Sequence, residues 1–177
     1  FYGRKWSLYE GGIRMPFIMR WDSKIPKSSK DSTSIVTAMD LFPSICSLIG
    51  VKYPDNLDGI DKSKSFLGSP IINKSPVMWE YSSNPGGSIK PGESWKIDGS
   101  MKPKNKNFHS PNLAIRSGDW KLLINTDLTD KRLYNLKNDP GEKLNLAEKE
   151  NEIVEELTNK VIEWRKSMPV EIPETIQ

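Results

Sequence analysis

The chain has 177 residues, which is enough for one ordinary domain or for a domain with a small annex. Hydrophobic residues make up 36% and charged residues 28%, a polar but still globular composition. The net charge of +3 is too small to indicate a nucleic-acid-binding surface. No stretch reaches the roughly 18 apolar residues that a membrane span requires.

The first half of the chain predicts one strand and one helix. Residues 16–21, PFIMRW, form a short apolar run typical of a buried strand. A helix is expected from Asp40 as its N-cap, with Pro43 in its first turn and Gly50 just after its end. The side chains expected to share its buried face are Leu41, Ile45, Leu48 and Ile49.

The second half predicts antiparallel strands followed by a helix. Strands are expected at 76–81, 112–117, 120–125 and 132–136, and Gly-Asp between the second and third suits a hairpin turn. Residues 148–168 have the periodicity of an amphipathic helix, with a stripe that should pack on the sheet. This order is typical of an α+β arrangement.

The opening stretch, residues 1–16, combines adjacent glycines with several charged residues. Paired glycines allow the backbone to approach another group closely, and nearby cations suit a tetrahedral oxyanion such as sulfate or phosphate. The same spacing also fits a tight turn with solvated side chains. We expect Glu10 and Arg14 to hold this loop through a salt bridge or backbone hydrogen bonds, with Arg14 the more buried.

Four blocks of sequence, at 5–16, 40–50, 114–123 and 133–147, together resemble the type I sulfatases. These formylglycine-dependent arylsulfatases belong to the alkaline-phosphatase-like superfamily. The first block carries Tyr-Glu-Gly-Gly-x-Arg-x-Pro after a lysine, and the four blocks occur in the family's order. The resemblance implies an α/β sulfatase fold, of which this chain would be the C-terminal part.

That resemblance also implies a division of the chain. Residues 1–75 would be the end of the catalytic domain and of its mixed α/β sheet. Residues 76–177 would be a C-terminal subdomain, a small antiparallel sheet packed by a helix. The expected partners are a sulfated small molecule or glycan and a missing N-terminal half, with no nucleic acid and no membrane. An exposed sheet edge at 16–21 could also support a homodimer.

The catalytic apparatus of such enzymes is largely missing from this sequence. The family's nucleophile is a formylglycine made from Cys or Ser in a C/S-x-P-S-R motif, which does not occur here. The only cysteine, Cys46, lies in the predicted helix and is interpreted as a core residue. The family's calcium ligands are expected outside this chain, so this piece alone should bind no calcium and be inactive. By resemblance, the enzyme is expected in the periplasm or outside the cell.

Lys5 is the one residue that the resemblance identifies as catalytic. It matches the family lysine that contacts the substrate sulfate. Arg4 could assist in binding the anion. In the long loop 82–111, Trp95 and His109 are further candidates for contact with substrate, although a solvated loop explains them equally.

Two other functions remain open from the residues alone. The chain could belong to a phosphate or phosphonate ester hydrolase of the same superfamily, which the upstream nucleophile would distinguish. It could instead be a non-catalytic sugar-binding or assembly module. An exposed apolar face would favour part of a larger enzyme, whereas a polar surface throughout would favour an independent module.

Overall fold

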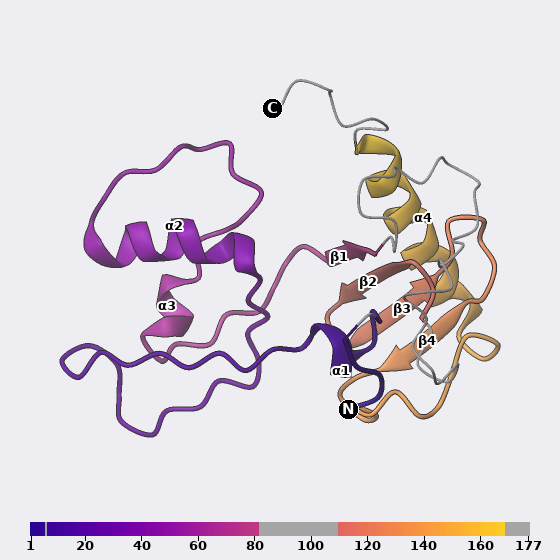
Figure 1. Ribbon diagram of the computed structural model, residues 1–177, viewed down its shortest axis with the longest axis horizontal. Helices are drawn as coiled ribbons and strands as arrows, with labels where there is room; N and C mark the ends of the chain where they lie inside the picture. Colours follow the sequence, from indigo (N-terminus) through magenta and orange to yellow (C-terminus); the bar gives the residue numbers. More distant parts are fainter. Residues whose placement is uncertain (6, 82–109, 169–177) are drawn as a thin grey trace. The chain divides into compact units, whose positions relative to one another are not determined.

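The chain is described by a computed structural model, which places residues 1–5, 7–81 and 110–168. It forms two compact units. The sheet unit consists of residues 1–15 with 75–177, and the helical unit consists of residues 16–74 (Figure 1).

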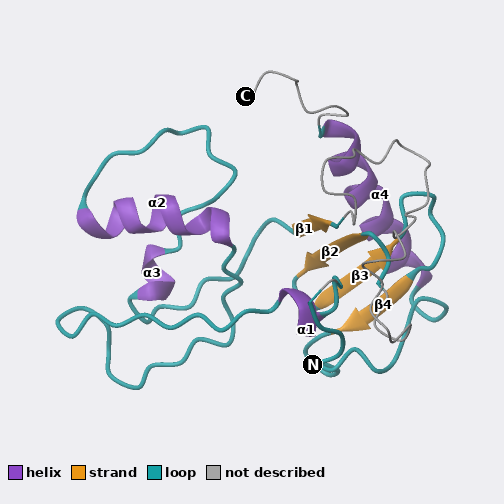
Figure 2. Cartoon of the chain, in the orientation of Figure 1, coloured by secondary structure: helices purple, strands orange, loops and turns teal. Residues whose placement is uncertain are grey.

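The sheet unit is built on four antiparallel strands in the order β1-β2-β3-β4 (Figure 2). They are β1 (Val77–Glu80), β2 (Leu113–Ser117), β3 (Trp120–Ile124) and β4 (Arg132–Asn135). The β2–β3 hairpin pairs Ile115 with Leu122 and turns at Gly118, whose φ of 57° suits glycine. The four strands predicted in the second half of the chain, their antiparallel pairing and the hairpin are confirmed.

Helix α4 (Asn151–Ser167) covers one face of this sheet and contacts β2 and β3. Its Leu157 and Val161 pack into a cluster with alternate residues of the strands. Arg165 also reaches across to Glu80 of β1, with Nε 2.7 Å from the carboxylate. The amphipathic helix predicted at 148–168 is therefore confirmed.

The opposite face of the sheet is covered by the N-terminal segment, residues 1–15, which includes the one-turn helix α1 (Glu10–Ile13). Leu8 and Tyr9 are buried there against Ala114, Leu123 and Tyr134. The strands thus bury both faces, which explains why Leu113–Ile115 and Leu122–Ile124 are fully buried without alternation. This packing fixes the loop that carries the charged residues of the opening stretch.

The helical unit contains α2 (Ala38–Ile49) and α3 (Ser63–Phe66). The predicted helix is confirmed, and Gly50 follows it with a φ of 74°. Its predicted start was wrong by three positions. Thr37 is the N-cap because the Asp40 carboxylate accepts hydrogen bonds from the Thr37 backbone N–H and hydroxyl, closing a capping box. Pro43 therefore lies beyond the first turn.

The predicted buried face of α2 was wrong at Ile45 and Ile49, while Leu41 and Leu48 are half-buried. The side chains that α2 buries include Asp40, Ser44 and Cys46, whereas Ile45 and Ile49 are 46% and 62% exposed. The polar side is buried because it serves neighbouring backbone groups within the unit. Asp40 accepts from the Ile60 N–H, and the Ser44 hydroxyl accepts from the Lys62 N–H.

The strand predicted at 16–21 is not formed. These residues have no regular secondary structure, and none of the described strands pairs with them. An apolar run becomes a strand only when a neighbour takes up its backbone hydrogen bonds. The homodimer expected from an exposed edge at this segment therefore loses its structural basis.

Candidate functional site

Lys5 lies in a tight turn near the start of the sheet unit. The Ser7 N–H donates to the Arg4 carbonyl at 3.1 Å, and the Ser7 hydroxyl donates to the same oxygen at 2.8 Å. Lys5 and Arg4 are exposed on this turn, whereas Ser7 is buried. The turn therefore displays two adjacent cationic residues while its base is fixed by hydrogen bonds.

Glycines allow the two arms of this segment to lie against each other. The Gly11 N–H donates to the Tyr2 carbonyl at 2.7 Å. A Cβ added at Gly11 would lie 2.5 Å from the carbonyl oxygens of both Tyr2 and Gly3, too close for any side chain. One at Gly12 would collide with the backbone oxygen of Ser7. The adjacent glycines are thus required by close backbone approach.

A buried ion network lies directly beneath this loop. The Lys121 ammonium of β3, fully buried, is 2.9 Å from Glu10 Oε1 and 2.9 Å from Glu142 Oε1. The other Glu142 oxygen accepts the Glu10 backbone N–H at 2.6 Å. Arg14 and Arg116 approach the second oxygen of Glu10 at 3.7 and 3.9 Å. One lysine of the sheet therefore joins two carboxylates that come from distant parts of the sequence.

Glu142 is held in an unusual position. Its backbone φ is 51°, and its N–H donates to the Asp139 carbonyl at 3.1 Å. Burial raises the pKa of its carboxyl, although the Lys121 ammonium acts in the opposite direction. Glu142 Oε1 contacts Lys121 as an ion pair but has no well-directed hydrogen bond.

A second, partly buried cluster fixes the same loop further toward β4. The Arg132 guanidinium donates to the Tyr9 hydroxyl and is also bound by Asp130 at 2.6 Å. The Tyr9 ring packs edge-on against Tyr134, with centroids 6.3 Å apart. Burial raises the pKa of both phenols, while the Arg132 cation opposes that shift. The loop is thus fixed to the sheet at two neighbouring residues, Tyr9 and Glu10.

The structure brings only part of the predicted site together. Lys5 and Arg4 lie on one turn, while Trp95 and His109 fall outside the described residues. Glu10 and Arg14 do interact, as expected, but the expected order of burial was wrong. The Glu10 side chain is 3% exposed and that of Arg14 is 47% exposed, because Glu10 is drawn into the sheet by Lys121.

Sequence reasoning missed Lys121 and Glu142. Lys121 could have been noticed as the one charge within the apolar run WKLLI, where strand alternation places it on the same face as Leu123. Glu142 lies in the block at 133–147 that carries the resemblance, but it follows an ordinary turn sequence and was given no role there. Their contact depends on tertiary packing alone.

The described residues contain no cluster of three or more His, Cys, Asp or Glu side chains that could hold a metal ion. Nor does any described helix combine the length and apolarity needed to cross a bilayer.

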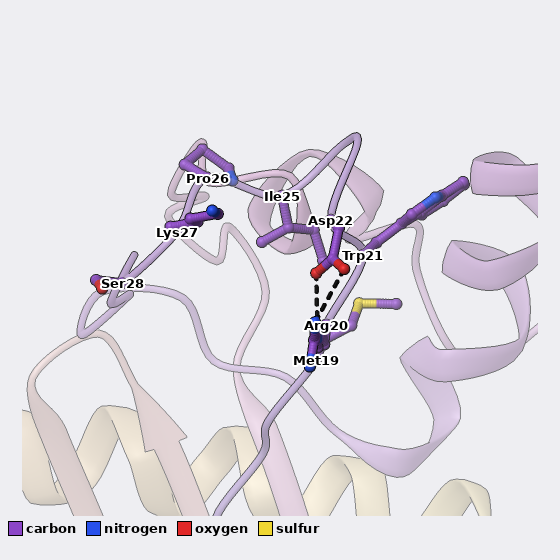
Figure 3. Close-up of a pocket in the computed structure, with 8 residues that line it drawn as sticks. All are labelled: Met19, Arg20, Trp21, Asp22, Ile25, Pro26, Lys27 and Ser28. Carbon is purple, nitrogen blue, oxygen red and sulfur yellow. Dashed lines mark hydrogen bonds and ion pairs between the residues drawn. The ribbon is translucent and has the colours of Figure 1, made fainter.

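The helical unit carries a surface hollow lined by residues 19–28 (Figure 3). Arg20 and Asp22 pair with each other there, with Nε and Oδ1 2.7 Å apart, and both are strongly exposed. One contiguous segment forms the whole lining, and its guanidinium is neutralised by its own neighbour. This hollow is not the candidate site.

Several curated proteins are similar to most of this chain. An N-acetylgalactosamine-6-O-sulfatase of Bacteroides thetaiotaomicron is 28% identical over 159 residues, covering 88% of this chain and 28% of that protein. Bovine arylsulfatase A is 28% identical over 176 residues, covering 86% and 30%. An ulvan-active sulfatase of Formosa agariphila is 25% identical over 181 residues, covering 92% and 35%. The chain thus spans about a third of their length.

Two solved structures share the fold of this chain over part of their own length. A structure from work on glycosaminoglycan metabolism by Bacteroides thetaiotaomicron matches 94% of this chain and 32% of its own, with a TM-score of 0.65 and 24% identity. Another, Ps i-CgsB in complex with k-i-k-neocarrahexaose, matches 80% and 27%, with a TM-score of 0.53 and 21% identity. No family model matches the chain.

Proposed function

We propose, from the premise that this chain is a homologue of the sulfatases over part of their length, that it is the C-terminal portion of a sulfuric ester hydrolase. In this proposal it acts when joined to the remainder of the enzyme. The observation that carries the proposal is the extent of similarity. Nearly the whole chain aligns with sulfatases, yet it accounts for only about a third of each.

Lys5 is the residue to which we assign direct contact with the substrate. Its turn is exposed at the tip and fixed at the base by Ser7, so the ammonium can reach an anion outside the sheet unit. A lysine placed at the bridging oxygen of a sulfate ester would offset the negative charge that develops there as the S–O bond breaks. The neighbouring Arg4 would add to the attraction for the anion.

The nucleophile and the cation of the reaction would be supplied by polypeptide outside this chain. The resemblance implies a formylglycine and a calcium ion, and the described residues fit neither group. What this chain would provide is the lysine, the loop that presents it and the sheet that supports the loop.

The surface of the helical unit favours part of a larger fold over an independent module. Met39, Phe42, Ile45 and Ile49 follow one another at helical spacing along α2 and are between 46% and 62% exposed. An apolar stripe of this size on a surface helix is typical of a face that packs against another element. We assign that element to the remainder of the same enzyme, since the relatives are about three times as long as this chain.

The substrate would be a sulfated carbohydrate or an aryl sulfate. Relatives that carry both kinds of name are similar to this chain, and nothing in the described residues chooses between them. By the same resemblance, the enzyme would act in the periplasm or outside the cell. Fractionation of cells that produce the longer protein, followed by immunodetection, tests that location.

The experiment that tests the function is a comparison of substrates by the longer protein that contains this chain. We expect it to hydrolyse a nitrophenyl sulfate much faster than the matched nitrophenyl phosphate or phenylphosphonate. Preference for a phosphorus ester would contradict the assignment in favour of the related hydrolases. Absence of turnover for the aryl sulfate, for a sulfated saccharide and for both phosphorus esters, from a folded protein carrying the nucleophile motif, would favour a non-catalytic module.

A further inference from the structure

We propose that Lys121, through its buried contacts with Glu10 and Glu142, positions the loop that presents Lys5. The expected effect on catalysis rests on the proposed function. The positioning of the loop by Lys121 does not depend on it. Lys121, Glu10 and Glu142 would be positioning residues, acting through the loop rather than on the substrate.

The first step is that the network joins the loop to an interior strand of the sheet. Lys121 lies in β3, which is paired on both sides by β2 and β4. Its neighbour Leu122 is fully buried beneath α4. A side chain anchored at this point has little conformational freedom, so its ammonium holds the carboxylates that it binds in a defined position.

The second step is that Glu10 receives this anchor through both its side chain and its backbone. Its carboxylate lies 2.9 Å from the Lys121 ammonium. Its backbone N–H donates to Glu142 at 2.6 Å, and Glu142 is itself bound to the same lysine. The main chain at Glu10 is therefore held in place as well as the side chain.

The third step connects Glu10 to the turn of Lys5. The residue after Glu10 is Gly11, whose N–H donates to the Tyr2 carbonyl at 2.7 Å. Gly12 packs against the backbone of both Ser7 and Arg4, the two residues that close the turn. The position of Lys5 is thus set by backbone contacts that begin at Glu10. Leu8 and Tyr9 also pack against the sheet, including Leu123 of β3, so the ion network adds a directed polar contact to this apolar one.

The chemistry explains why an ion network suits this role. A lone buried lysine would lose its charge or destabilise the fold, and so would a lone buried carboxylate. Because Lys121, Glu10 and Glu142 satisfy one another, each has a single low-energy arrangement. The result is a loop with one defined geometry, and a displacement of about 1 Å at a catalytic group can cost on the order of 100-fold in rate.

The test compares two variants with a matched control. Lys121→Met removes the ammonium but keeps an unbranched side chain. Lys121→Met with Glu142→Gln removes one charge of each sign and leaves Glu10 paired with Arg14 and Arg116. Lys137→Met, at an exposed lysine after β4, is the control. Amide hydrogen exchange is measured on the chain, and turnover of a nitrophenyl sulfate is measured on the longer protein.

In both test variants we expect exchange at residues 8–13 to rise by about tenfold or more, while 113–117 and 120–124 keep their protection. In the longer protein, kcat should fall by about tenfold or more with a smaller change in KM, because substrate still binds but Lys5 is misplaced. Lys121→Arg, which keeps a cation at this position, should recover a large part of kcat. Lys137→Met should match the wild type throughout.

The contradicting results are distinct from those that would overturn the proposed function. Unchanged exchange at 8–13 overturns the inference, and so does loss of protection throughout the sheet in both variants, because the network would then hold the core rather than the loop. Faster exchange at 8–13 with unchanged kcat, where Lys5→Ala abolishes turnover, overturns the positioning role. If exchange at 8–13 is faster but Lys5→Ala does not change turnover, the network does hold the loop, and the proposed function of Lys5 is overturned.

Discussion

At the scale of single residues, the main finding is that the buried side chains of the opening stretch determine its conformation. Lys5 and Arg4 are exposed, but Tyr9 and Glu10 reach inward to partners on β3, β4 and the turn that follows. The exposed cations have the chemistry for an anion, whereas the buried residues determine where those cations lie.

Tyr134 provides a pH-dependent test of this buried surface. Burial raises the pKa of its phenol above the ordinary value of about 10. The unfolded chain therefore ionises first as pH rises, and the contribution of Tyr134 to stability is lost from about pH 10 upward. Tyr134→Phe removes this phenol, so its free energy of unfolding should decline less between about pH 9 and 11 than that of the wild type.

Urea unfolding at a series of pH values measures this difference. Absorbance at 295 nm should also show fewer phenols titrating late in the variant. If the wild type and Tyr134→Phe lose stability in parallel over this range, the burial of this phenol is not as described.

At the scale of elements, the strands and the helices α2 and α4 could be predicted from sequence because their signals are local. Short apolar runs around a Gly-Asp turn identified β2 and β3, and helical periodicity identified α4. What could not be predicted depends on partners far along the chain. PFIMRW forms no strand without a neighbour, and the partner of Glu10 is 111 residues away.

Helix α2 shows the same limit. Its periodicity gave the helix but assigned its apolar side to the interior, whereas the side buried within its own unit carries Asp40 and Ser44. A hydrophobic pattern indicates that a helix face should be covered. It does not indicate which part of the protein covers that face. The candidate site could be predicted at Lys5 because a sequence motif is local. Lys121 was missed because its contacts with the loop join residues that are distant in the sequence.

Asp40 offers a test at this scale. Its carboxylate accepts from the Thr37 N–H and from the Ile60 N–H, at 2.8 and 2.9 Å. Asp40→Ala removes a helix cap worth about 1 kcal/mol and leaves a partly buried donor without its acceptor, at a further cost of about 1–3 kcal/mol. We expect the helical unit to be destabilised by about 2 kcal/mol or more.

Hydrogen exchange at residues 38–49 measures this loss within the unit concerned. Asp55→Ala, at an exposed aspartate of the same unit, should leave the exchange unchanged. Equal protection in Asp40→Ala and the wild type would contradict the capping role.

At the scale of the whole molecule, the chain has the features of one portion of a larger hydrolase. The sheet unit has a complete core, buried on both faces of four strands. The helical unit instead presents the apolar stripe of α2 to solvent. This contrast is consistent with a chain that spans about a third of the relatives it resembles.

The stripe itself can be tested by substitution. Phe42→Ser with Ile49→Ser should lower the binding of a hydrophobic dye by the chain alone, with little effect on its stability, because both side chains are more than half exposed. In the longer protein the same pair should be strongly destabilising, since each site would then lie in a packed interface. Equal stability of the longer protein with and without these substitutions would contradict the proposed interface.

The most direct test of the central claim is steady-state turnover of a nitrophenyl sulfate by the longer protein with Lys5→Ala, beside Lys30→Ala as an exposed control. If Lys5 contacts the sulfate, kcat/KM should fall by about 100-fold or more in Lys5→Ala and stay at the wild-type value in Lys30→Ala. Turnover by Lys5→Ala equal to that of the wild type would contradict the account.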